Sequence, residues 1–293
     1  MSTPLQFPEE YVDEFYRRDP DLAGMSPEQR RDHYLRHGRQ EGRCASPGAT
    51  RQGLASLIGN ARALEIGPFA RPFLKGKNVR YFDVLDTDGL RRRAIKVGED
   101  PKGCPDPVHY VDPHGNLDLI DEHFEIVLSS HAIEHQPDLV HHLRQVAKKL
   151  EAGGRYLLIV PDKRFCFDHF LAESTVADVI DACVRNPHMH SVKSVIEHRC
   201  LTTHNDAIRH WKGDSGPRPV GDAGAINSAV AEAIEAHRAG TYLDVHAWYF
   251  TPQSFRSVFT SLLDAGYSPF EVERVYDTPH QQLEFVASLR LPT

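Results

Sequence analysis

The feature that most constrains this chain is an apolar run that ends in a glycine turn, Leu64-Glu65-Ile66-Gly67-Pro68-Phe69. A second apolar run follows and ends in an acid, Val79-Arg80-Tyr81-Phe82-Asp83. This order is typical of a strand–turn–helix unit that binds a nucleotide-like group. Glycine lets the backbone approach a ligand, and the acid accepts hydrogen bonds from ribose hydroxyls. The full G-x-G-x-x-G pattern is absent, so the rest of the chain has to support this interpretation.

The alternation of strands and helices continues along the chain. Further strands are predicted at 108–112, 124–130, 155–160, 270–275 and 283–287, and a helix carries Leu139, Leu143, Val146 and Leu150 on one face. This pattern predicts an α/β fold with a doubly wound, mostly parallel seven-stranded sheet. Ligands of such sheets bind at the carboxyl ends of the strands, where Gly67, Asp83, Asp112 and Ser130-His131 fall.

Two segments interrupt this pattern and define the expected domains. Residues 1–48 predict a small helical module, because Asp19-Pro20 and Ser26-Pro27 are typical helix starts. Residues 49–293 form the main domain, and residues 164–245 are an insertion in it. The insertion has two amphipathic helices, separated by an irregular, histidine-rich stretch. We expect it to cap the carboxyl edge of the sheet, with the histidines facing a pocket.

Composition excludes several classes of protein. The chain has 293 residues and a formal net charge of -7, and Arg91-Arg92-Arg93 is its only basic triplet, which disfavours nucleic acid as a partner. The five cysteines include no C-x-x-C pair, which favours a reducing compartment. Met1-Ser2-Thr3-Pro4 has no signal-peptide pattern, and no apolar run approaches the roughly 20 residues of a membrane span. We therefore expect a cytoplasmic protein.

With these blocks in order, the chain resembles the class I S-adenosylmethionine-dependent methyltransferases. The resemblance rests on Leu-Glu-Ile-Gly (64–67), on the acids after the second and third strands, and on two longer blocks. These are Phe-Glu-Ile-Val-Leu-Ser-Ser-His-Ala-Ile-Glu-His (124–135) and Lys-Leu-Glu-Ala-Gly-Gly-Arg-Tyr-Leu-Leu-Ile-Val-Pro-Asp (149–162). It covers roughly residues 50–163 and 245–290, and it implies a Rossmann-like methyltransferase fold with S-adenosyl-L-methionine as cofactor.

The resemblance also implies roles for single residues. Glu65, Gly67 and Pro68 would shape the turn around the methionine part of the cofactor, and Asp83 would take the ribose hydroxyls. Asp112 and Pro113 would lie at the adenine, and Ser130 and His131 would line the site after the fourth strand. Phe69 and Ala70 stand where the family has further glycines, so the turn is expected to be less open.

A second, shorter resemblance concerns the acceptor. Residues 16–43 are similar to small modules fused to bacterial glycosyltransferases and related surface-glycan enzymes. This favours methylation of a hydroxyl on a sugar or glycan precursor, and a role for the module in docking a glycan-synthesis partner. The alternatives are a methyltransferase for another small molecule and a non-catalytic adaptor with a methyltransferase fold.

A hydroxyl acceptor needs a base or a metal that lowers its pKa, and histidine suits the role of base because its unperturbed pKa lies near 6.5. His131, His204 and His246 are the candidate catalytic residues, and His135, His210, Trp211 and Trp248 are the candidate substrate-binding residues. Trp211 equally suits a purely structural role as an anchor of the insertion. The side chains of His188, His190, Glu197 and His198 are of the types that hold a divalent metal. Because histidines near carboxylates are common without metal, no metal site is assigned from the sequence.

Overall fold

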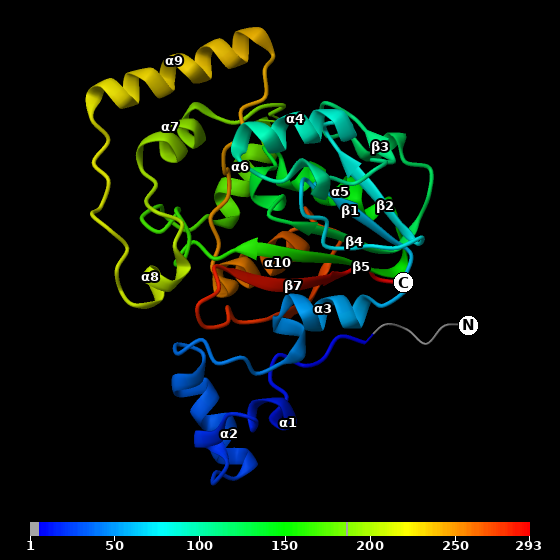
Figure 1. The fold of residues 1–293 in the computed structure, drawn as a ribbon, viewed down its shortest axis with the longest axis vertical. Helices are drawn as coiled ribbons and strands as arrows, with labels where there is room; N and C mark the ends of the chain where they lie inside the picture. The colour runs from blue at the N-terminus through cyan, green and yellow to red at the C-terminus, as the bar shows by residue number, and fades with distance from the viewer. Residues whose placement is uncertain (1–5, 186) are drawn as a thin grey trace.

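A computed structural model describes residues 6–185 and 187–293, and its centre is one seven-stranded sheet with helices on both sides (Figure 1). Residues 1–5, which contain the start that was searched for a signal peptide, lie outside the described residues. The strands are β1 Ala63–Ile66, β2 Val79–Asp83, β3 Tyr110–Val111, β4 Phe124–Ser130, β5 Leu150–Pro161, β6 Glu271–Val275 and β7 Glu284–Arg290. None of the described helices is long and apolar enough to cross a membrane.

The strand order is β3-β2-β1-β4-β5-β7-β6. The first five strands of this order pair in parallel, while β7 runs antiparallel to both β5 and β6. The predicted seven-stranded, mostly parallel sheet is therefore confirmed. The order reverses at β1 and β4, so the loops after these two strands leave the sheet at its topological switch point.

Helices pack on both faces of the sheet because the central strands bury side chains on both sides. The longer helices are α3 Arg51–Ile58, α4 Thr87–Val97, α5 Leu139–Ala147, α6 Val176–Arg185, α7 Val192–Cys200, α9 Ala223–Ala239 and α10 Pro252–Asp264. On one face, α3 covers Ile126, Leu128 and Leu157. On the other, α5, α6 and α10 pack over Val127 and Leu158.

Two element boundaries differ from the sequence prediction. The α5 helix ends at Ala147, and Leu150 begins β5 instead of continuing the helix, because Phe124 donates its backbone N–H to the Lys149 carbonyl at 2.9 Å. The third strand is only two residues long. Just before it, the Tyr81 amide donates to the ring Nδ1 of His109 at 3.1 Å instead of to a backbone carbonyl, while the His109 amide donates to the Tyr81 carbonyl at 3.0 Å.

The insertion contains more regular structure than expected. Its histidine-rich part, predicted to be irregular, includes α7 and the short α8 Ala207–Trp211. The α7 and α9 helices pack on each other through Val195, Ala229 and Ala233 and lie at one side of the molecule in Figure 1. By contrast, α6 packs against α5 and α10, so this part of the insertion belongs to a helical layer on the sheet.

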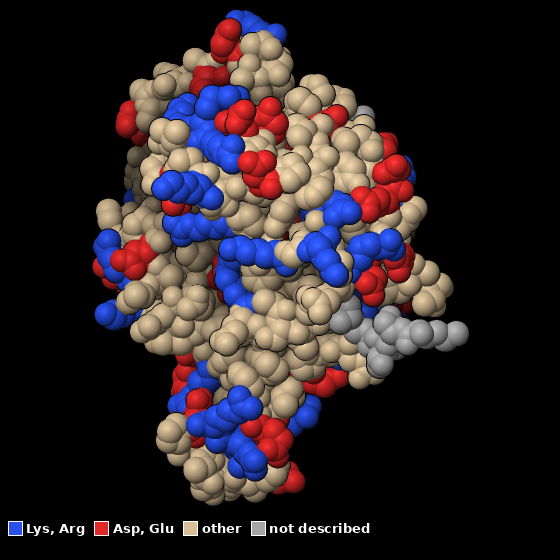
Figure 2. Space-filling view, turned by 45° about the vertical axis from the view of Figure 1, so that its right-hand side comes forward, with Lys and Arg blue, Asp and Glu red and all other residues tan. Residues whose placement is uncertain are grey.

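The N-terminal segment lies beside the main sheet, at the bottom of Figure 1. It contains the short α1 Asp13–Tyr16 and α2 Pro27–His33, which is followed by a π-helical turn over Tyr34–Gly38. A cluster of Tyr16, Leu22, Tyr34 and Ala45 holds these turns together. Figure 2 shows Lys and Arg interspersed with Asp and Glu, both over this segment and over the main body.

Candidate functional site

The turn after β1 has the geometry that a close backbone approach requires. Gly67 has φ +70°, and a side-chain carbon there would meet Ala132 Cβ at 3.4 Å. Glu65 supports the loop beyond the turn, because its carboxylate accepts hydrogen bonds from the backbone N–H groups of Phe73 (2.7 Å) and Leu74 (2.8 Å). Burial raises the pKa of Glu65 to about 7, although these two amides oppose the shift. Pro68 follows Gly67 and is buried.

The two acids lie at the ends of neighbouring strands, at the same edge as Gly67. The Asp112 amide donates to the Asp83 carbonyl at 3.2 Å, and the Gly67 amide donates to the Phe82 carbonyl at 2.9 Å. Asp83 is 8% exposed, and burial raises its pKa to about 6. Asp112 is partly exposed and holds the following turn by accepting from the amides of His114 and Asn116, while Pro113 lies exposed in that turn.

These residues fit the expected cofactor: Asp83 would serve its ribose, and Gly67 would leave room for its methionine part. A positive-φ glycine leaves room for a ligand beside the backbone, and a mostly buried carboxylate at the end of β2 offers an acceptor for hydroxyl groups. The fit concerns Gly67 and Asp83 most directly, because the Glu65 carboxylate is already occupied by loop amides.

A cavity of about 290 Å³ opens beyond the carboxyl ends of β4 and β5. It is lined by His131, Glu134, His135, Pro161, Cys166, Phe167, His198, Asn205, Asp244, His246 and Leu283. The lining comes from the loop after β4, from the insertion and from the segment before α10. The structure thus brings together His131, His135 and His246 of the predicted residues, together with several that were not predicted.

His131 lies at the mouth of this cavity in a constrained backbone conformation. Its φ is +51°, and its side chain is 33% exposed. Its Nε2 lies 2.7 Å from Glu284 Oε2, and Arg51 binds the same carboxylate. Burial opposes ionisation of Glu284, but the hydrogen bonds from His131 and Arg51 outweigh it and lower the pKa of this carboxyl to about 2. Arg51 also donates to Ser130 Oγ at 3.0 Å.

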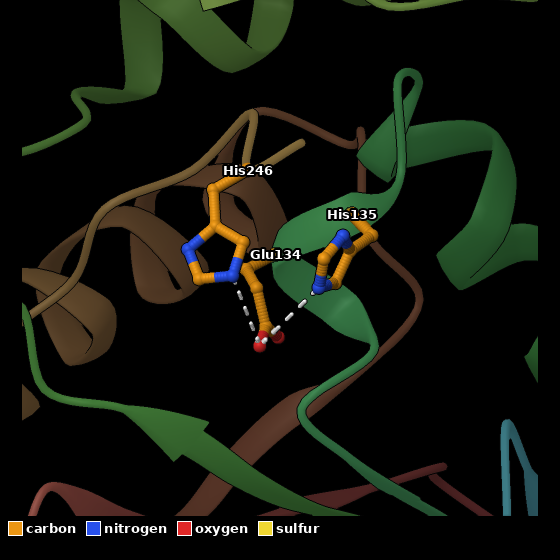
Figure 3. Close-up of side chains that lie close together, drawn as sticks. All are labelled: Glu134, His135 and His246. Atoms are coloured by element: carbon orange, nitrogen blue, oxygen red, sulfur yellow. Dashed lines mark ion pairs between the residues drawn. The ribbon is translucent and has the colours of Figure 1, made fainter. Parts of the chain in front are cut away.

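Glu134, His135 and His246 converge on one point of the cavity wall (Figure 3). Glu134 and His135 come from the single 3₁₀ turn after β4, Ile133–His135, and His246 comes from the segment before α10. Their closest ligand-type atoms all lie within 4.8 Å of one another. Within residues 6–185 and 187–293, this is the one set of three His, Cys, Asp or Glu side chains close enough to share an ion.

The other predicted residues lie outside the lining of this cavity. His204 accepts the Asp206 amide at Nδ1 and contacts the Asp214 carbonyl through Nε2. His210 is buried between Ser215 Oγ and the His204 carbonyl. Trp211 stacks on Phe165 at 3.9 Å and donates to the Gln282 carbonyl, and Trp248 is a core residue that donates to the Gln136 carbonyl. The two tryptophans thus anchor the insertion and the late segment.

Sequence reasoning missed Phe167 and Asp168 as parts of the site. His198 was considered only as a metal ligand together with His188, His190 and Glu197, and Glu134 was expected to be structural or close to the cofactor. Asp168 Oδ2 lies 2.7 Å from His246 Nδ1, although 78 residues separate them in the chain. No spacing in the sequence predicts that pair.

Comparisons with known proteins give a limited result. No protein-family model and no curated protein matches the chain. Among solved structures, an S-adenosylmethionine-dependent methyltransferase from Mesorhizobium loti is similar over 80% of this chain and 92% of its own, with 15% identity and a TM-score of 0.38. The CcbJ methyltransferase from Streptomyces caelestis matches over 87% and 94%, with 13% identity and a TM-score of 0.40.

The mitomycin 7-O-methyltransferase MmcR is a further match, at 12% identity and a TM-score of 0.38, over 95% of this chain and 60% of that one. TM-scores below 0.5 carry no conclusion about function. The strand order of this sheet defines the fold, and the residues at its carboxyl edge are the basis for the inferred activity.

Proposed function

We propose that this protein is an S-adenosylmethionine-dependent methyltransferase that methylates a hydroxyl group of a small molecule. One observation carries the proposal: Gly67, Asp83 and Asp112 lie together at the edge of the sheet beside a polar cavity lined by His131. Bound S-adenosylmethionine supplies an electrophilic methyl group on a sulfonium sulfur. Asp83 would hold the ribose hydroxyls, and Gly67 would leave space for the methionine part.

His131 is the candidate base. A general base needs a partner that orients it, and the Glu284 carboxylate at 2.7 Å holds His131 Nε2. The remaining ring nitrogen, Nδ1, would then receive the proton of an acceptor hydroxyl placed in the cavity. The cavity is near the lower end of the volumes usual for small-molecule sites, about 300–1,000 Å³, so we expect a compact polar acceptor.

A sugar or glycan precursor is the acceptor class that we favour, because of the short resemblance in residues 16–43. The structure offers compatible chemistry, since Asn205, His131 and His198 present hydrogen-bonding groups in the cavity and Phe167 presents an aromatic ring. This N-terminal segment also remains our candidate for docking a partner in glycan synthesis.

The base is tested by His131→Ala. Candidate sugar acceptors are incubated with the protein and S-adenosylmethionine, and the methylated product is measured by mass spectrometry. Loss of a general base lowers turnover by roughly 10² to 10⁴ while leaving cofactor affinity nearly unchanged. The exposed His141→Ala serves as control and should keep normal turnover. Normal turnover in His131→Ala would remove the base assignment.

A further inference from the structure

Glu134 is a buried carboxylate without a hydrogen-bond partner. Its side chain is fully buried, and neither Oε1 nor Oε2 has a hydrogen-bond partner among the described residues. An isolated ionised carboxylate in the interior is costly unless a charge or a set of donors compensates it. Among the described residues, no Lys or Arg pairs with Glu134, whose ion pairs involve histidines alone.

Histidine nitrogens surround this carboxylate at distances that are too long for hydrogen bonds. Glu134 Oε1 lies 3.8 Å from His131 Nδ1, 4.0 Å from His135 Nε2 and 3.9 Å from His246 Nε2. Two atoms bound to one transition-metal ion at about 2.0–2.2 Å lie between about 3 and 4.4 Å apart. The observed spacing suits a shared ion better than direct contact.

The outer nitrogens of two of these rings face carboxylates. His246 Nδ1 is hydrogen-bonded to Asp168 Oδ2 at 2.7 Å, whereas His135 Nδ1 lies at ion-pair distance, 3.0 Å, from Asp244 Oδ1 without hydrogen-bond geometry. When the outer nitrogen donates to a carboxylate, the inner nitrogen of a neutral ring carries a lone pair, here aimed at Glu134. Such carboxylate–histidine pairs are the usual second layer of protein metal sites, where they fix the ring orientation.

The charges of the side chains around Glu134 also favour a bound cation. It holds three carboxylates, those of Glu134, Asp168 and Asp244, and Arg93 pairs with Asp244. Within the described chain, the ion pairs of Glu134 and Asp168 involve histidines alone, with no Lys or Arg. A divalent cation would balance the two remaining carboxylates and satisfy the converging lone pairs at once.

We propose that Glu134, His135 and His246 bind a divalent first-row transition-metal ion, with Asp168 and Asp244 orienting the two histidines. Two imidazoles and one carboxylate suit Zn²⁺, Co²⁺ or Mn²⁺ better than Mg²⁺ or Ca²⁺, which prefer oxygen ligands. Three protein ligands leave open positions toward the cavity, as in catalytic metal sites.

The role of the ion rests on the proposed function. An ion at this point faces the cavity into which His131 also points, so it would bind an acceptor hydroxyl and lower its pKa. The chemical class of acceptor then narrows to molecules that present a hydroxyl, or two neighbouring hydroxyls, to a metal.

The metal site can be tested without measuring methyl transfer. Metal-free full-length protein is titrated with Co²⁺ in the absence of cofactor, and binding is followed by calorimetry and by the visible d–d absorption of the bound ion. One equivalent should bind with an absorption typical of mixed nitrogen and oxygen ligands, and Zn²⁺ should displace it. Failure of the folded wild-type protein to bind either ion at millimolar concentration would overturn the proposal, and this measurement depends on no variant.

Variants then locate the ion. Glu134→Gln and His246→Ala should abolish the tight site, and Asp168→Asn should weaken Co²⁺ binding about 10- to 100-fold through loss of ring orientation. The exposed Glu235→Gln and His141→Ala are matched controls and should bind as wild type. Unchanged Co²⁺ affinity and spectrum in folded Glu134→Gln and His246→Ala would contradict the assignment. If metal binds but S-adenosylmethionine does not, the metal site stands and the proposed function falls.

Discussion

At the scale of single residues, two buried glutamates show how differently the same side chain is used. Glu65 accepts two loop amides, whereas Glu134 has no hydrogen-bond partner among the described residues. The first stabilises the loop that follows β1, and the second is available for a ligand. Burial alone does not distinguish these roles, but the hydrogen-bond partners do.

The raised pKa of Glu65 predicts a pH dependence of stability. Its ordinary value of 4.5 rises to about 7 in the fold, so between these values the folded protein binds more protons than the unfolded chain. The free energy of unfolding should therefore fall as pH rises from 4.5 to 7, by at most about 3 kcal/mol from this group, and then level off. Denaturant titrations at several pH values should show a flatter profile for Glu65→Gln. The exposed Glu235→Gln should follow wild type, and a Glu65→Gln profile parallel to wild type would contradict the pKa.

At the scale of elements, the sequence predicted what lies close in the chain. The β1, β2 and β4 strands and the helices α9 and α10 were found from apolar patterns and their caps, Asp222 and Thr251. The placement of Gly67, Asp83 and Asp112 at one edge of the sheet followed because each stands directly after a strand. The helices α7 and α8 were missed, although Ser191 and Asp206 cap them in the usual way.

Only part of the cavity wall could be predicted: His131, His135 and His246 were named, but their arrangement around Glu134 and Asp168 was not. His246 and Asp168 are brought to Glu134 by the path of the insertion, which depends on long-range packing. Three residues of the insertion were expected at the pocket, His204, His210 and Trp211. In the structure the two histidines pack against each other within the insertion, and Trp211 packs against the loop before β7.

Trp211 provides a test of how the insertion is held. It stacks on Phe165 and donates a hydrogen bond to the Gln282 carbonyl. Trp211→Ala should therefore lower the free energy of local unfolding around α8 by about 1.5–3 kcal/mol. Hydrogen exchange should show faster exchange of amides in residues 203–214 and little change in the central strands. Trp211→Phe keeps the stacking and should give an intermediate effect. Unchanged exchange in Trp211→Ala would mean that other contacts fix the segment.

At the scale of the whole molecule, segments distant in sequence hold the site in place. Two hydrogen bonds join the N-terminal segment to the loop between β6 and β7. The Tyr34 hydroxyl donates to Asp277 Oδ2 at 2.5 Å, and the His280 amide donates to the Gly42 carbonyl at 2.7 Å. The same stretch before β7 leads to Glu284, which holds His131, and Arg51 of α3 joins them. The N-terminal segment is thus linked through the backbone to the loop that positions the candidate base.

The central claim is that this edge of the sheet binds S-adenosylmethionine, and calorimetric titration of the full chain tests it most directly. Wild type should bind S-adenosylmethionine or its demethylated product with micromolar affinity. Asp83→Ala should lose about 1.5–3 kcal/mol of binding free energy, because a charged acceptor for two hydroxyls is removed. Exposed Glu235→Gln is the control. Absence of binding to folded wild type, or equal binding by Asp83→Ala, would contradict the account.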